Sequence, residues 1–211
     1  EGIPAVAVYH AGLAYRGPGI PSFGSGLPIG GSWGAEGERI SRRAARLERT
    51  IDAGLARARA DAGLPPAETG PYFWTSRHCT LVLTAQQAEA PREPLPPRTF
   101  YVGPCFGERR TGAAPGFPFE RLSDSLRKVY VSLGTVFNDK PNVFRRLIGA
   151  LAGGGRQLVV SAGGAYRRLH ADPLPADVLL FERVPQIDVL PRMDAVVSHG
   201  GNNTVHETLA A

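Results

Sequence analysis

The chain has 211 residues, of which 43% are hydrophobic and 20% charged, as is typical of a soluble globular protein with one domain or two small ones. No run of about eighteen apolar residues occurs, so we expect no membrane span. The first residues lack the basic and apolar pattern of a secretory signal. Cys79 and Cys105 form neither a disulfide framework nor a metal-ligand pattern. We therefore expect a cytoplasmic protein.

The net charge of +5 comes almost entirely from arginine. Arginines crowd one region, which is compatible with a nucleic-acid surface or with a solvated helix face. Acidic residues are interleaved with them and no basic-aromatic motif accompanies them, so we favour the helix face and expect no nucleic-acid partner. The clustered residues are Arg39, Arg42, Arg43, Arg46, Arg49, Arg57 and Arg59.

In the first hundred residues, short apolar segments at 4–9, 79–84 and 100–102 predict strands. Residues 16–37 are rich in Gly, Pro and Ser and predict a long loop. Apolar residues from Ile40 to Ala58 then recur every three or four positions. This spacing predicts an amphipathic helix that ends before a Gly-Leu-Pro-Pro sequence.

Residues 104–127 are punctuated by Gly and Pro and predict a linker between two domains. We assign residues 1–103 to part of an N-terminal domain and 128–211 to part of a C-terminal domain. Position 1 is not Met, and the chain stops inside a helix that begins near Asn203. We therefore expect the chain to be an internal piece of a longer protein.

The second half alternates between short apolar strands and helices, which predicts an α/β fold with a parallel, doubly wound sheet. Strands are predicted at 129–133, 157–161, 178–181 and 194–198, and helices at 141–151 and from 186 to about 190. In such sheets ligands bind beyond the carboxyl ends of the strands. Four loops are expected to converge there.

The stretch from His199 to Glu207 carries the strongest functional signal. It follows a short apolar strand with a glycine-rich turn and then opens a helix. The first-turn amides of a helix have no helical partner, and the helix dipole places partial positive charge there. His199 and Asn202 add side-chain donors. The pattern predicts a site for the diphosphate and ribose of a nucleotide.

Four motifs together resemble the GT-B fold glycosyltransferases, and within them the bacterial macrolide-type branch of the UDP-glycosyltransferase superfamily. The motifs are Tyr130–Phe137, Val184–Leu190, Asp194–Ala210 and Phe100–Pro104. The resemblance covers residues 100–211 well and the earlier residues loosely. It implies two Rossmann-like domains, an acceptor-binding one and a nucleotide-sugar-binding one, each only partly present.

The resemblance also implies roles for individual residues. His199 would contact the diphosphate, and the helix start that follows it would donate to the phosphates. Glu207 would accept from the ribose hydroxyls, and Gln186 with its neighbours would hold base and ribose. The implied donor-binding residues are Ser132, Gly134, Thr135, Arg183, Val184, Gln186, His199, Gly200, Gly201, Asn202, Asn203, Thr204 and Glu207.

Three features depart from the family pattern. Arg183 stands where the family usually has an aromatic residue, although a guanidinium plane can also stack on a base. The sugar-reading acidic residue and glutamine would follow Ala211. The general-base histidine would precede Glu1, and His10 is a weak candidate within the chain. We therefore expect this fragment alone to be inactive.

The function implied is an inverting, metal-independent transfer of a sugar from a UDP- or dTDP-sugar to a hydroxyl of a small natural product. The resemblance implies no cofactor, because the UDP- or dTDP-sugar is itself a co-substrate. It also implies a role in natural-product biosynthesis, including antibiotic biosynthesis. The alternatives are a sugar-nucleotide epimerase on the same fold and a non-catalytic nucleotide-sugar-binding fragment. Thr204 and Glu207 also fit a capping box that needs no ligand. No pattern specifies an oligomeric state.

Overall fold

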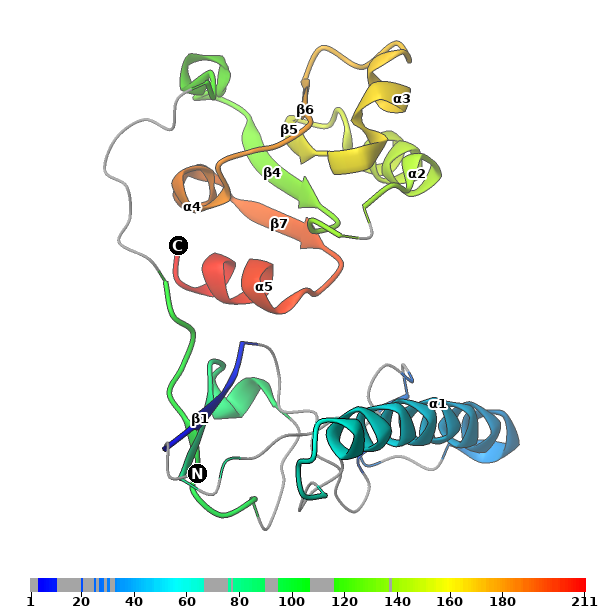
Figure 1. Cartoon of the computed structure of the whole chain (residues 1–211). Coiled ribbons are helices and arrows are strands. Elements are labelled where there is room, and N and C mark those ends of the chain that lie inside the picture. Colours follow the sequence, from blue (N-terminus) through cyan, green and yellow to red (C-terminus); the bar gives the residue numbers. More distant parts are fainter. Residues whose placement is uncertain are drawn as a thin grey trace. The chain divides into compact units, whose positions relative to one another are not determined.

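A computed structural model of the chain describes residues 4–10, 20, 25, 27–28, 30, 33–66, 76, 78–89, 95–106, 116–136 and 138–211. The chain divides into two compact units, Glu1–Cys105 and Phe106–Ala211, and each is built around its own parallel sheet (Figure 1). Among the described residues, no helix has both the length and the apolar character needed to cross a membrane.

The first unit contains a three-stranded parallel sheet in the order β1-β2-β3. Its strands are β1 (Val6–Tyr9), β2 (Cys79–Val82) and β3 (Thr99–Tyr101), and a short 3₁₀ helix, η1 (Gln86–Ala88), follows β2. All three predicted strands are confirmed, with ends that differ by up to two residues. The central strand β2 is the most buried, because Thr80 and Val82 are both fully covered.

The helix of the first unit, α1 (Gly34–Asp61), is confirmed but begins six residues earlier than expected. The predicted loop over 16–37 is therefore wrong at residues 34–37, and most of its remainder lies outside the described residues. Gly37 is buried against the side chain of Trp33. This glycine suggested a loop, but in the structure it allows close packing within the helix. Exposed ion pairs join Arg39 to Glu36 and Arg42 to Glu38, as a solvated helix face would have.

The second unit contains a four-stranded parallel sheet in the order β6-β5-β4-β7. The strands are β4 (Arg127–Ser132), β5 (Arg156–Ser161), β6 (Val178–Phe181) and β7 (Ala195–Ser198). The helices are α2 (Pro141–Leu151), α3 (Tyr166–His170), α4 (Gln186–Val189) and α5 (Asn202–Leu209), with 3₁₀ helices η2 (Phe119–Arg121), η3 (Gly163–Ala165) and η4 (Leu190–Arg192). The predicted parallel sheet is confirmed, and α3 was not predicted.

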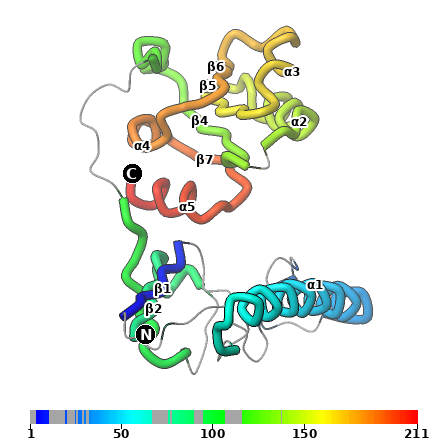
Figure 2. Tube along the Cα trace, viewed as in Figure 1, coloured from blue at the N-terminus to red at the C-terminus, as the bar shows by residue number. Residues whose placement is uncertain are grey.

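Alternate residues of the strands fill two cores, one on each face of the sheet. On one face, Val131 and Val160 pack with Phe144 of α2 and Leu169 of α3. On the other face, Tyr130 packs among residues that include Val159, Leu179 and Val189 of α4. The Cα trace in Figure 2 continues from β7 through α5 to the C-terminal end. Residues on both faces of the central strands β4 and β5 are thus buried.

Part of the predicted linker packs against the second sheet. Phe117 is buried, and its ring lies 4.8 Å from that of Phe119 and 5.0 Å from that of Phe181. The side chain of Gln157 accepts from the Ser123 amide and donates to the Arg121 carbonyl. The packed unit therefore begins before the expected boundary at residue 128. Gly and Pro mark irregular backbone, but they do not reveal whether that backbone is packed. Residues 107–115 lie outside the described part.

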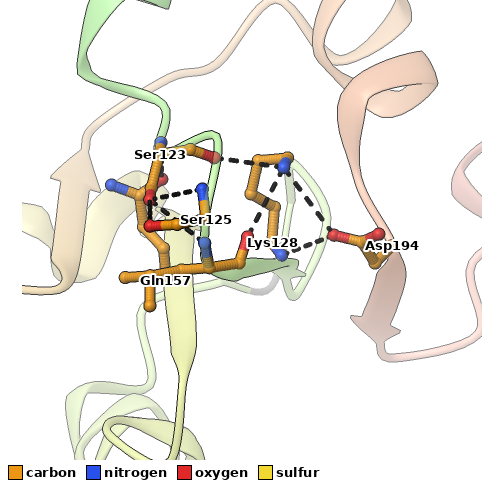
Figure 3. Close-up of polar contacts among 6 residues, drawn as sticks. Ser123, Ser125, Lys128, Gln157 and Asp194 are labelled. Atoms are coloured by element: carbon orange, nitrogen blue, oxygen red, sulfur yellow. Dashed lines mark hydrogen bonds and ion pairs between the residues drawn. The ribbon is translucent and has the colours of Figure 1, made fainter.

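A polar cluster holds this packed segment to the amino ends of β4 and β7 (Figure 3). The Lys128 ammonium donates to the Ser123 carbonyl at 3.2 Å and lies 3.9 Å from the Asp194 carboxylate. The same carboxylate accepts from the Lys128 amide at 2.6 Å. Ser123 and Ser125 close the turn between them through their hydroxyls. These contacts lie at the end of the sheet opposite the loops described next.

Candidate functional site

The loops expected to form a site all leave the same edge of the second sheet. Ser132 of β4 is in register with Ser161 of β5 and with Ser198 of β7. Because the strands are parallel, their carboxyl ends lie level and their loops are neighbours. Two of these serines close their own turns. The Ser132 hydroxyl accepts from the Gly134 amide at 3.3 Å, and the Ser198 hydroxyl accepts from the Gly200 amide at 3.1 Å.

The imidazole of His199 lies in a slot between two glycines. A Cβ atom built on Gly134 would lie 2.6 Å from the His199 Cε1 atom, and one built on Gly201 would lie 2.5 Å from both Cε1 and Nε2. Neither position could carry a side chain without displacing the ring. His199 is itself exposed, so the ring is open to a ligand. The slot brings together the loops after β4 and β7.

Helix α5 begins directly beside this imidazole. Gly201 is its N-cap residue, no side chain caps the helix, and the Val205 amide is bonded to the Gly201 carbonyl at 3.0 Å. The earlier amides of the first turn precede that bond and have no acceptor within the helix. The capping-box alternative is wrong, because Thr204 lies in the third helical position rather than at the N-cap. Thr204 is buried, and its hydroxyl accepts a hydrogen bond from another residue of the site.

That residue is Gln186, the first of α4, whose side-chain amide joins three elements. Its Oε1 atom accepts from the Tyr130 hydroxyl at 3.0 Å. Its Nε2 atom donates to the Glu207 Oε2 atom at 2.6 Å and to the Thr204 hydroxyl at 3.4 Å. The structure therefore brings Gln186 and Glu207, two predicted site residues, into direct contact. No sequence motif indicated this role for Tyr130, which is 1% exposed.

The surroundings of Tyr130 keep its hydroxyl protonated. Burial raises the pKa of Tyr130, and the negative charge of Glu207 also raises it, whereas hydrogen bonding with the hydroxyls of Ser132 and Ser161 lowers it. The net direction is upward from the ordinary value of a tyrosine. At neutral pH this buried phenol is therefore a hydrogen-bond donor.

Asn138 connects two of the loops, and no sequence motif indicated this role. It is buried, donates to the Gly134 carbonyl at 2.7 Å and accepts from the Gly164 amide at 2.9 Å. A Cβ atom on Gly163 would collide with the Asn138 amide, so the close approach requires glycine there. Local sequence contains no signal for this contact, because it depends on β4 and β5 being neighbours. The neighbouring motif residue Phe137 lies outside the described residues.

The other predicted donor-binding residues lie at the same edge of the sheet, or next to it, but vary in burial. Thr135, Arg183 and Asn203 are exposed, whereas Val184 packs partly against the core on the Tyr130 face. His10, the weak candidate for a base, is exposed and directly follows β1 in the first unit. The site residues of the second unit thus form an open polar edge around His199 and Glu207.

Comparison with known proteins identifies the family to which the second unit is similar. Residues 119–211 match the family model described as UDP-glucoronosyl and UDP-glucosyl transferase. This segment belongs to the UDP-glycosyltransferase family. The match covers the whole of the second sheet, its four strand-end loops and α5. The family resemblance inferred from the motifs is therefore confirmed.

Two curated bacterial proteins are similar to parts of the chain. The chain is 36% identical to demethyllactenocin mycarosyltransferase of Streptomyces fradiae over 54% of this chain and 26% of that protein. It is 33% identical to 4'-demethylrebeccamycin synthase of Lentzea aerocolonigenes over 70% of this chain and 35% of that protein. The chain thus spans only about a third or less of these relatives.

A solved structure extends the likeness to the first unit. The crystal structure of the glycosyltransferase of kitacinnamycin superposes with a TM-score of 0.70 at 20% sequence identity, covering 99% of this chain and 50% of that one. At this identity the likeness concerns the fold alone. The structural neighbours have the GT-B fold, so the predicted fold class is confirmed, with only part of that fold present.

Proposed function

We propose that the protein containing this chain transfers a sugar from a UDP- or dTDP-sugar to a hydroxyl of a small natural product, with inversion and without a metal. The observation that carries the proposal is the imidazole of His199 held between two glycines at the start of α5, with Glu207 further along the same helix. The family of residues 119–211 and the antibiotic glycosyltransferases among its relatives support it.

In this proposal the edge of the second sheet binds the nucleotide. The first-turn amides of α5 carry partial positive charge, and the His199 ring beside them can donate a hydrogen bond. Together they suit a negatively charged diphosphate. Glu207, on the same helix, accepts from the ribose hydroxyls. The exposed guanidinium of Arg183 stacks on the base, a role its planar group can fill.

The chemistry follows from the charge that develops during transfer. The acceptor oxygen forms a bond to the anomeric carbon as the bond from that carbon to the diphosphate oxygen breaks. The electron pair of the broken bond stays on the diphosphate, where His199 and the α5 amides stabilise it. The hydroxyl proton passes to a general base. Within this chain His10 is only a weak candidate for that base.

Nucleotide binding is tested on the 211-residue chain by calorimetric titration with UDP and with dTDP at low salt. Saturable binding of at least one is expected. The variant His199→Ala loses a hydrogen bond to a charged phosphate, worth about 1.5 to 3 kcal/mol, so the dissociation constant should rise about 10- to 150-fold. No saturable heat with either nucleotide would remove the donor-site assignment.

Transfer is tested on the full-length protein with a UDP-sugar and a hydroxylated macrolide or flavonoid. Mass spectrometry should detect acceptor that has gained one hexose. Hydrolysis or epimerisation of the donor without any transfer would contradict the proposed reaction while leaving nucleotide binding intact.

A further inference from the structure

We propose that Tyr130 and Gln186 are positioning residues that hold the Glu207 carboxylate for the ribose. This inference rests on the proposed function, because it refines how the same site binds its donor. It adds a supporting role to the ligand contact expected for Gln186.

The hydrogen-bonding capacity of Gln186 is largely used within the protein. Its side chain has two N–H donors. One is directed at the Glu207 carboxylate at 2.6 Å, a short contact typical of a charge-assisted bond, and the other at the Thr204 hydroxyl at 3.4 Å. Its carbonyl oxygen already accepts from Tyr130. Both ends of this amide are therefore directed at other side chains of the protein.

The orientation of the amide follows from the charge on Glu207. A carboxylate only accepts hydrogen bonds, so the NH₂ end of Gln186 must face it. The carbonyl end must then face Tyr130, whose hydroxyl has to be the donor. Tyr130 suits this task because its buried phenol stays protonated at neutral pH. Each of the three side chains therefore fixes the direction of the next.

These contacts connect the central strand β4 to helix α5. Tyr130 lies in β4, at the centre of the sheet, and is 1% exposed, so its hydroxyl has one fixed location. Glu207 lies in α5 and is only half-buried. Within the described residues its Oε2 atom is bonded to Gln186, whereas its Oε1 atom has no recorded bond and is available to accept from a ribose hydroxyl.

Holding a side chain in one rotamer before binding removes an entropic cost that a free side chain would incur on binding. Loss of the Tyr130 hydroxyl should therefore weaken nucleotide binding by about 2- to 10-fold. The effect should be confined to ligands that carry a ribose. Inorganic pyrophosphate lacks one, so its binding should stay within about twofold of the unsubstituted chain.

The experiment is a double-mutant cycle with Tyr130→Phe and Glu207→Ala, titrated with UDP and with pyrophosphate. In the chain that retains Glu207, Tyr130→Phe should weaken UDP binding by the stated factor. In the Glu207→Ala background, the same substitution should add no further loss, because the group being positioned is gone. Tyr166→Phe in α3 is the matched control and should change the binding of neither UDP nor pyrophosphate.

Several results would overturn the inference. Equal losses from Tyr130→Phe in both backgrounds would mean that Tyr130 acts independently of Glu207. If Tyr130→Phe weakened pyrophosphate binding as much as UDP binding, the substitution would distort the whole site rather than release Glu207. If Tyr130→Phe does not fold, Gln186→Met enters the same cycle with the same expectations. Absence of UDP binding by the unsubstituted chain would instead refute the proposed function, so the two failures are distinguishable.

Discussion

The substitution Gly201→Ala tests whether the slot around His199 matters for ligand binding. Gly201 has φ −63° and ψ 139°, a conformation that alanine adopts without strain. The new methyl group would lie 2.5 Å from the His199 Cε1 and Nε2 atoms, whereas carbon contacts are normally about 3.5 Å or longer. The imidazole therefore has to move by about 1 Å or rotate towards solvent.

The expected magnitudes separate binding from stability. His199 is exposed, so moving its ring should cost little folding free energy, and the loss of glycine at the N-cap should cost about 1 kcal/mol or less. A displaced imidazole would lose the proposed hydrogen bond to the diphosphate, worth about 1.5 to 3 kcal/mol. The dissociation constant for UDP should rise about 10- to 150-fold with only a small fall in melting temperature.

The assay is calorimetric titration with UDP, paired with thermal unfolding of the same samples. Gly149→Ala is the control, because Gly149 lies in α2 with nothing within 4 Å of an added Cβ atom. It should stabilise the fold by about 0.5 to 1 kcal/mol and leave binding unchanged. In a His199→Ala background, Gly201→Ala should cause no further loss. A folded Gly201→Ala chain that binds UDP within twofold of the original would refute the reasoning.

Three further substitutions test the packing of the second unit, each by denaturant unfolding. Phe144→Ala empties a site that is 0% exposed between α2 and the sheet and should destabilise the unit by about 3 to 5 kcal/mol; a loss below 1 kcal/mol would contradict this core. Asn138→Ala leaves the Gly134 carbonyl and the Gly164 amide without their shared partner and should cost about 1 to 3 kcal/mol, together with weaker UDP binding. Asp194→Ala removes the acceptor of the Lys128 amide at a half-exposed position and should cost about 1 kcal/mol without altering UDP affinity.

The sequence predicted the second sheet well because its signals are local. Apolar segments bounded by glycine locate the strands, and α2 was predicted with both ends correct, since proline begins it and glycines follow it. The short helix α3 was missed, because five residues with one buried leucine contain too little periodicity to detect. The start of α1 was misplaced, because Gly34 and Gly37 suggested a loop.

The structure brings predicted site residues close together, but the contacts that join them could not be predicted. His199, the start of α5, Gln186 and Glu207 are marked by motifs, and the structure brings them to one edge of the sheet. The roles of Tyr130 and Asn138 depend on contacts between segments 56 and 26 residues apart, which no local pattern encodes. The direct bond between Gln186 and Glu207 is of the same kind, because it forms only after α4 and α5 are both in place.

The close fit of Asn138 and His199 has a consequence for engineering this protein. Asn138 joins the loops that follow β4 and β5, and His199 rests on Gly134 of the first of these loops. The turns after β4, β5 and β7 thus depend on one another for their conformations. A designer who wishes to swap donor preference by transplanting segments from a homologue should move all three turns in concert, because any one of them grafted alone would meet a mismatched neighbour.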